Sequence, residues 1–131
     1  MKKILFLLAI GGGLLVASCT KQYNQVVPNQ TVYANIAPTN WTTTAAGTAD
    51  SVAINTPEID QFFADHGGVD VYFTFDNGNS YEQIPEVYNS ISFSYVYTAG
   101  GVILYSQTPT GTLPSAPPAA LTAKIVLSPS N

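Results

Sequence analysis

The sequence offers one candidate pair of side chains for acid–base chemistry. His66 directly follows Asp65, and an acid beside a histidine could form a proton-transfer pair. Such catalysis also needs a nucleophile or a substrate cleft, and no sequence motif places either one near this pair. A solvated histidine near the negative end of a short helix explains His66 equally well, and that interpretation requires no reaction.

Recognisable metal and catalytic motifs are missing from the sequence. Residues 76–80, Asp-Asn-Gly-Asn-Ser, carry oxygen atoms that could hold a calcium ion, but typical calcium loops contain more acids and end in a bidentate Glu. A tight turn explains the same Asn-Gly pair. The sequence also has no Gly-x-Ser-x-Gly, His-Glu-x-x-His, phosphate-binding glycine loop or Cys/His cluster. We therefore expect a protein that is not an enzyme, with no catalytic residue, no metal site and no cofactor.

Aromatic side chains are the best candidates for binding a ligand. The chain has 8 Tyr, 6 Phe and 1 Trp, and exposed aromatics on a sheet can stack on sugar rings or contact protein partners. Strand alternation places Tyr72 on the face opposite Val71, and we expect Trp41 and Tyr81 near the rims of a sheet. These three residues are the predicted ligand-binding set. Ordinary cross-strand packing is the alternative for each of them.

The N-terminus resembles the export signal of bacterial lipoproteins. Residues 1–3 are Met-Lys-Lys, residues 4–16 are apolar, and residues 16–19, Val-Ala-Ser-Cys, resemble the lipobox. In lipoproteins the cysteine of this motif is diacylglycerylated and the leader is cut just before it. The resemblance implies a signal peptide over residues 1–18, lipidation of Cys19 and attachment to a membrane. A secreted protein with an unpaired thiol is the alternative, because Cys19 is the only Cys. Thr20 follows in place of a retention Asp, which favours the outer membrane and leaves the membrane face open.

Charge argues against nucleic acid as a partner. The chain carries 4 Lys and 8 acidic residues, for a net charge of −4. Removing the leader with Lys2 and Lys3 leaves only Lys21 and Lys124 as basic residues. Phosphate binding requires clustered Lys or Arg, so we expect no nucleic-acid ligand.

Hydrophobic alternation predicts an all-β domain. We expect strands over residues 31–35, 41–44, 51–55, 69–75, 81–84, 87–98, 102–105 and 123–127. Thr56 as N-cap and Pro57 at the first helical position predict one short helix that ends at Gly67. A tight turn is expected at residues 76–79, and a proline-rich connection over residues 108–120. The pattern indicates an antiparallel immunoglobulin-like β-sandwich of about seven strands. The predicted divisions are a signal peptide over 1–18, a lipidated tether over 19–38 and the sandwich over 39–131.

The layout also resembles a group of small Bacteroidota lipoproteins of uncharacterised function. The matching segments are the lipobox at 16–19, Trp41, the helix at 57–67, Val-Asp-Val-Tyr at 69–72, Ile-Pro at 84–85 and Lys-Ile-Val at 124–126. This resemblance implies the location and the fold, and no activity. In addition, Asp50-Ser51-Val52 resembles the O-glycosylation acceptor triplet of Bacteroidota envelope proteins, which makes Ser51 a candidate glycan site.

Two functions follow as hypotheses. The first is a lipid-anchored binding or accessory module of the cell envelope that holds a glycan or protein ligand through exposed aromatic side chains. The second is a structural envelope component with no small-molecule ligand.

Overall fold

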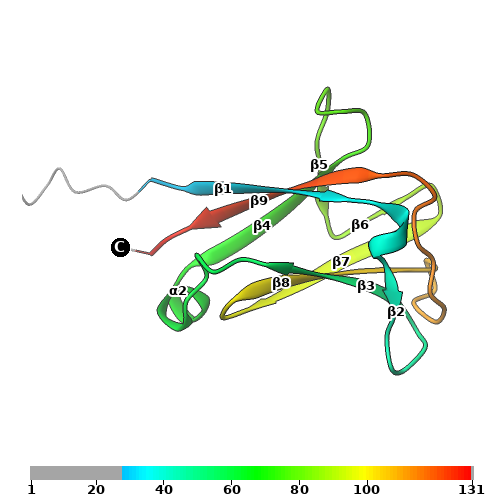
Figure 1. Cartoon of the computed structure of the whole chain (residues 1–131), viewed down its shortest axis with the longest axis horizontal. Helices are drawn as coiled ribbons and strands as arrows, with labels where there is room; N and C mark the ends of the chain where they lie inside the picture. Colours follow the sequence, from blue (N-terminus) through cyan, green and yellow to red (C-terminus); the bar gives the residue numbers. More distant parts are fainter. Residues whose placement is uncertain (1–27, 131) are drawn as a thin grey trace, which may run out of the picture.

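The computed structural model describes residues 28–130, in which alternating side chains build two β-sheets (Figure 1). The signal peptide expected over 1–18 and the lipidation site Cys19 lie outside the described residues. The elements are β1 (Gln30–Ile36), η1 (Pro38–Asn40), β2 (Thr42–Thr43), β3 (Asp50–Asn55), α2 (Gln61–His66), β4 (Gly68–Thr74), β5 (Glu82–Ile84), β6 (Glu86–Tyr88), β7 (Ile91–Thr98), β8 (Gly101–Gln107) and β9 (Leu121–Ser128). None of the helices in this part of the chain is long and apolar enough to cross a membrane.

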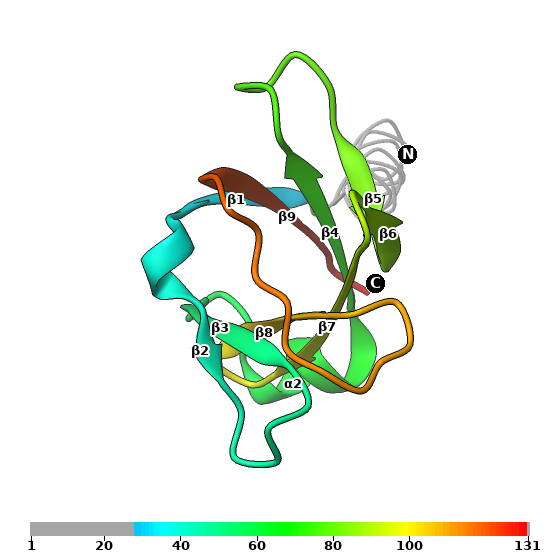
Figure 2. The ribbon, with the colours of Figure 1, turned by 90° about the vertical axis from the view of Figure 1, so that its right-hand side faces the viewer.

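The two sheets pack as a sandwich, which confirms the predicted all-β fold class. One sheet has the strand order β1-β9-β4-β5 and the other β2-β3-β8-β7-β6, and every strand pair is antiparallel. Figure 2 shows η1 crossing from β1 in the upper sheet to β2 in the lower one. Strands β5 and β6 are joined at Pro85, where the chain passes from the first sheet to the second. The immunoglobulin-like topology stays a prediction.

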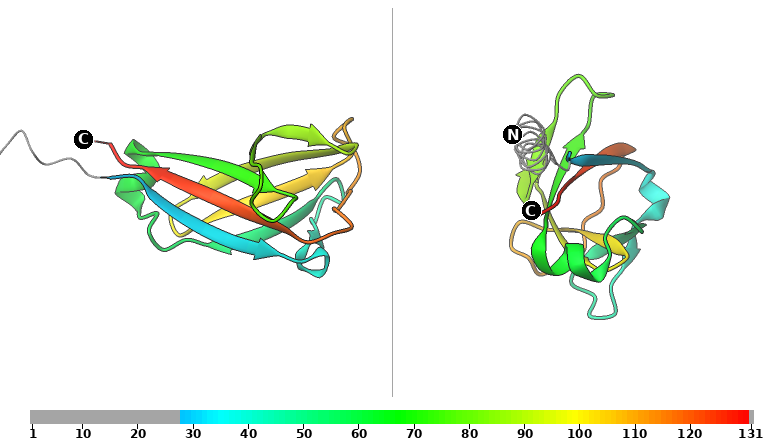
Figure 3. Two further views of the ribbon diagram at one scale, coloured as in Figure 1. Left: turned by 90° about the horizontal axis from the view of Figure 1, so that it is seen from above. Right: turned by 90° about the vertical axis from the view of Figure 1, so that its left-hand side faces the viewer.

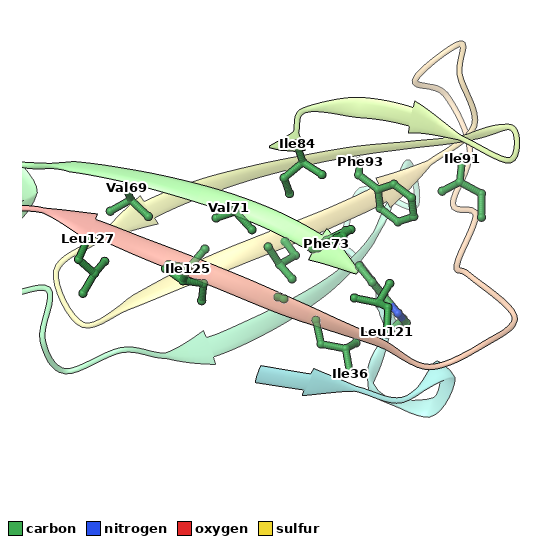
Figure 4. Packing of buried hydrophobic residues seen from close by; sticks show 14 of the residues in the cluster. Ile36, Val69, Val71, Phe73, Ile84, Ile91, Phe93, Leu121, Ile125 and Leu127 are labelled. Atoms are coloured by element: carbon green, nitrogen blue, oxygen red, sulfur yellow. The ribbon is translucent and has the colours of Figure 1, made fainter. Parts of the chain in front are cut away.

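The core consists of the inward-facing residues of both sheets (Figure 4). Strand β9 illustrates the pattern, because Leu121, Ala123, Ile125 and Leu127 are buried and the residues between them are only half-buried. Aromatic rings fill the end of the core near η1, where Phe93 packs edge-on against Phe73 with ring centroids 5.1 Å apart. Such an edge-to-face pair contributes about 0.5–1.5 kcal/mol beyond the area it buries.

The short helix begins later than the sequence predicted. Asp60, not Thr56, is its N-cap, and the Asp60 carboxylate accepts a hydrogen bond of 2.7 Å from the Phe63 amide. Thr56 is fully buried, and its own amide donates to the Gly100 carbonyl, so the sheet ladder still holds it. The Thr56 hydroxyl donates to the Ile54 carbonyl at 3.2 Å and α2 starts only at Gln61, so the predicted Thr56 cap was wrong. The expected end of the helix at Gly67 is confirmed.

The predicted strand over residues 87–98 is two strands. Strands β6 and β7 form a hairpin whose two loop residues, Asn89 and Ser90, have φ of 48° and 62°. Positive φ at both positions is what a type I′ turn requires, and it reverses the chain without a glycine. The neighbouring hairpin, β4–β5, is present as predicted, but its loop is longer than a two-residue turn, because Phe73 pairs with Glu82.

The strand expected near residues 31–35 is a full member of the four-stranded sheet. Strand β1 pairs with β9 from Gln30 to Ile36, and Ile36 is buried in the core. The sandwich therefore begins at Gln30 and not at the predicted residue 39. Figure 3 shows that β1 starts beside the end of β9, so both described ends of the chain lie at one end of the sandwich.

Candidate functional site

The outward side of the four-stranded sheet carries a group of tyrosines around a single lysine. Lys124 on β9 pairs with Tyr33 on β1 and with Tyr72 on β4, so these three side chains form one row across the sheet. Tyr81, just before β5, joins them from the edge of the sheet. We call Tyr33, Tyr72, Tyr81 and Lys124 the tyrosine face. It combines two of the three predicted ligand-binding residues.

Lys124 lies against two of these rings. Its Nζ is 4.1 Å from the centroid of the Tyr81 ring and 4.6 Å from that of Tyr72. Both distances are inside the roughly 6 Å range in which an aromatic ring attracts a cation. The rings therefore restrain the ammonium group at the surface, where it can donate up to about three hydrogen bonds.

Lys124 carries a positive charge in a domain whose other charged side chains are acidic. Among residues 28–130 it is the only Lys or Arg, against eight Asp and Glu. Asp70, two residues before Tyr72 on β4, faces the same side and accepts a hydrogen bond of 3.3 Å from the Gln83 side chain. The tyrosine face thus presents one positive centre on an otherwise acidic domain.

The aromatic side chains of the candidate site differ in their exposure to solvent. Tyr33 is 60% exposed and Tyr81 is 40% exposed, whereas Tyr72 is half-buried between its neighbours. Trp41 is only 8% exposed, and its ring packs 6.3 Å from that of Phe93. The expectation that Trp41 lies exposed at the rim of a sheet is therefore wrong, because the indole fills the core where the chain passes from η1 into β2.

The two residues of the candidate proton-transfer pair do not contact each other through their side chains. His66 Nδ1 lies 3.0 Å from the Phe62 carbonyl oxygen, and its ring stacks on the Phe62 ring at 4.3 Å. The Asp65 carboxylate instead accepts a hydrogen bond from Gln61 at 3.0 Å. Both groups are engaged within α2, an arrangement that fits the interpretation as an exposed helix end.

The loop after β4 uses its acid to hold its own backbone. The Asp76 carboxylate accepts hydrogen bonds from the Ser80 hydroxyl at 2.6 Å, the Ser80 amide at 2.9 Å and the Thr74 hydroxyl at 2.9 Å. These bonds, led by the one from the Ser80 hydroxyl, lower the pKa of Asp76. No group of three or more His, Cys, Asp or Glu that could hold a metal ion occurs in the part of the chain that is described.

Two carboxylates, Glu82 and Glu86, flank the sheet crossing at Pro85. Glu86 Oε1 is buried and has no hydrogen-bond partner among the described residues. Burial raises the pKa of the Glu86 carboxyl, and the charge of Glu82 raises it further.

Ser51 lies within β3, paired with Thr42 of β2 on one side and Tyr105 of β8 on the other. It is half-buried on the outward side of the five-stranded sheet, the side that also carries Tyr105. Its glycosylation stays a prediction.

Comparison with known proteins yields no match. No family model, no curated protein and no solved structure resembles the chain at a significant level. The resemblance to small Bacteroidota lipoproteins therefore stays a prediction.

Two members of the tyrosine face, Tyr33 and Lys124, were not predicted from the sequence. Alternation along each strand shows that both point outward. Their contact depends on β1 pairing with β9, strands that are almost the whole domain apart in sequence. The one signal that could have found Lys124 is that it is a lone cation within an apolar strand.

Proposed function

We propose that this chain is a lipid-anchored binding module of the cell envelope, and that the tyrosine face binds a glycan. The observation that carries the proposal is the position of Lys124 against Tyr72 and Tyr81 on an exposed sheet surface. Sugar rings stack on aromatic faces through their C–H groups, and the ammonium group can donate hydrogen bonds to hydroxyls or pair with an acidic sugar. An acidic sugar is favoured because Lys124 is the single positive centre of the described domain.

The sheet supplies the rigidity that such a site needs. Tyr33, Lys124 and Tyr72 lie on three hydrogen-bonded strands whose opposite faces are packed in the core. Their spacing is therefore set before any ligand arrives, and little conformational entropy is lost on binding. In this proposal the protein holds its ligand without altering it, so it is not an enzyme.

The binding experiment uses polysaccharides as probes. In affinity electrophoresis, the parent chain should be retarded by an acidic polysaccharide such as alginate more strongly than by a neutral one such as dextran. Tyr81→Ala and Tyr72→Ala should abolish the retardation, with folding checked by circular dichroism. Tyr105→Ala is the matched control, because Tyr105 is on the outward side of the other sheet. Normal retardation of the folded Tyr81→Ala and Tyr72→Ala variants would show that the site is elsewhere.

The anchor is proposed from the lipobox resemblance and tested separately. Fatty-acid labelling should mark the parent chain and not Cys19→Ala. Digestion by protease added to intact cells would place the protein on the cell surface, and protection would place it in the periplasm. Absence of label on both chains would contradict lipid anchoring.

The structural alternative predicts a different result. A structural envelope component would bind none of the polysaccharides, and crosslinking in cells would recover one fixed protein neighbour through either sheet face. Recovery of that neighbour by both the parent and Tyr81→Ala would favour this alternative over the binding module.

A further inference from the structure

Two strand edges on the same side of the sandwich lack a partner strand in the described structure. Strand β1 is the outer strand of its sheet and pairs only with β9. Strand β3 pairs with β8 along its whole length, but β2 covers it only at Asp50 and Ser51. The rest of that edge of β3, from Val52 to Asn55, faces no strand.

The hydrogen-bond pattern shows which backbone groups point to this free edge. In antiparallel pairs, successive residues direct their N–H and C=O groups to opposite sides. The Thr44 amide donates to the Ala49 carbonyl on the β2 side, and the Thr56 amide donates to the Gly100 carbonyl on the β8 side. The backbone groups of the odd-numbered residues of β3 therefore point away from β8. This directs the N–H and C=O of Ala53 and Asn55 to the free edge. These four backbone groups have no hydrogen-bond partner among residues 28–130.

A groove lies between the two edges. It has a volume of about 470 Å³ and is lined by Ala34–Ile36 of β1, by Asn40 and Thr42, and by residues 51–55 of β3. The lining mixes apolar side chains, such as Ile54, with amides and hydroxyls. This mixture suits a strand whose side chains alternate between small apolar and polar types.

Neither edge carries the usual protection against strand addition. Natural edges are blocked by charged residues, prolines or bulges. The seven residues of β1 include no charged residue and no Pro. Residues 51–55 of β3 also contain no charged residue and no Pro. The charged groups near the groove are both acidic: Asp50 begins β3, and Glu58 lines a second hollow with residues 30–32 of β1.

We propose that this groove binds an extended peptide segment of a partner protein, which adds as a strand to the free edge of β3. The segment carries small apolar side chains at alternate positions and a basic residue that lies near Glu58. A second copy of this chain fits less well, because each described domain has one Lys against eight acidic residues.

The test uses a fluorescein-labelled peptide of about six residues, the usual length of a strand, with Thr and Val alternating and one Lys at an end. Fluorescence anisotropy should show saturable binding to the purified chain, and the amide protons of Ala53 and Asn55 should become protected from hydrogen exchange. Ala53→Pro removes an N–H that β8 does not use, so the sandwich should fold while the affinity falls about tenfold. Glu58→Gln should weaken binding of the Lys peptide and leave a Lys-free peptide unchanged.

A second probe keeps the test decisive if Ala53→Pro fails to fold. The same peptide with an N-methyl group on every residue has no backbone N–H on either edge, so it cannot form the ladder and should not bind the parent chain. Equal affinity of the two peptides, or of the parent and a folded Ala53→Pro variant, would overturn the proposal. So would a lack of saturable binding up to millimolar peptide, or self-association of the chain that Ala53→Pro abolishes.

Discussion

Replacing Lys124 with Met should destabilise the domain through the two tyrosine rings that it contacts. Lys124 Nζ is 4.1 Å from the Tyr81 ring centroid and 4.6 Å from that of Tyr72. A partly exposed cation over an aromatic ring contributes about 0.5–1 kcal/mol, so the two rings together give about 1–2 kcal/mol. Met keeps the length and the apolar stem of the side chain and removes only the charge.

Double-mutant cycles isolate this contribution from other effects of the substitution. The unfolding free energies of the parent, Lys124→Met, Tyr81→Leu and the double variant would be measured by urea denaturation at neutral pH. The expected coupling between Lys124 and Tyr81 is about 0.5–1 kcal/mol, and the cycle with Tyr72→Leu should give a similar or smaller value because of the longer distance.

Tyr105 provides the negative control, because it lies on the other sheet and should show no coupling to Lys124. Coupling energies near zero for both Tyr81 and Tyr72 would refute the idea that the rings hold the ammonium group. The proposed preorganisation of the tyrosine face would then lose its basis.

Three further predictions concern the core and two acids. Phe93→Ala should lower the unfolding free energy by about 3–5 kcal/mol in the same urea assay, since the ring is 1% exposed and packs against Phe73 and Trp41; a loss below 1 kcal/mol would contradict this core packing. Glu86→Gln should stabilise the domain at neutral pH, because it removes a half-buried negative charge that lies close to Glu82. Because the pKa of Glu86 is raised in the folded state, the parent chain loses stability as the pH rises through that pKa and the carboxyl becomes charged. The unfolding free energy of Glu86→Gln should therefore depend less on pH between about pH 4 and 8. The same pH dependence in both chains would show that the pKa of Glu86 is not raised by folding. Asp76→Asn should destabilise the domain at neutral pH. The pKa of Asp76 is lowered in the folded state, so the charged carboxylate stabilises the fold above its usual pKa, and this contribution is lost as the pH falls. Thermal melts should therefore show a lower Tm for the variant at neutral pH and a smaller difference in acid.

Local patterns predicted the strands better than they predicted the turns and the helix start. Strands β4 and β9 follow a plain two-residue alternation, so the sequence predicted both strands and the outward position of Tyr72 on β4. The β6–β7 turn was missed because Asn89 and Ser90 adopt positive φ without the glycine that usually marks such a turn. The helix start was predicted wrongly because Thr56 is still part of the sheet. The hydrogen bond from its amide to the Gly100 carbonyl is a tertiary contact that no local pattern reveals.

The candidate site was only partly predictable for a related reason. Alternation correctly placed Tyr72 on an outward face, and it gave no information on which strands become neighbours. Lys124 meets Tyr72 because β9 inserts between β1 and β4, and this order is a property of the whole sandwich. Trp41 was misplaced because a two-residue strand has too little alternation to show which way its neighbouring ring points.

The pairing of β1 with β9 also sets how the domain would respond to mechanical force. A tether that pulls on Gln30 while a ligand holds the sheet face loads the ladder in shear, so that its seven residue pairs resist together. A pull between the two ends of the chain instead peels the same ladder from the Gln30–Leu127 pair, one residue pair at a time. The domain should therefore resist detachment from a bound surface much better than it resists stretching between its own ends.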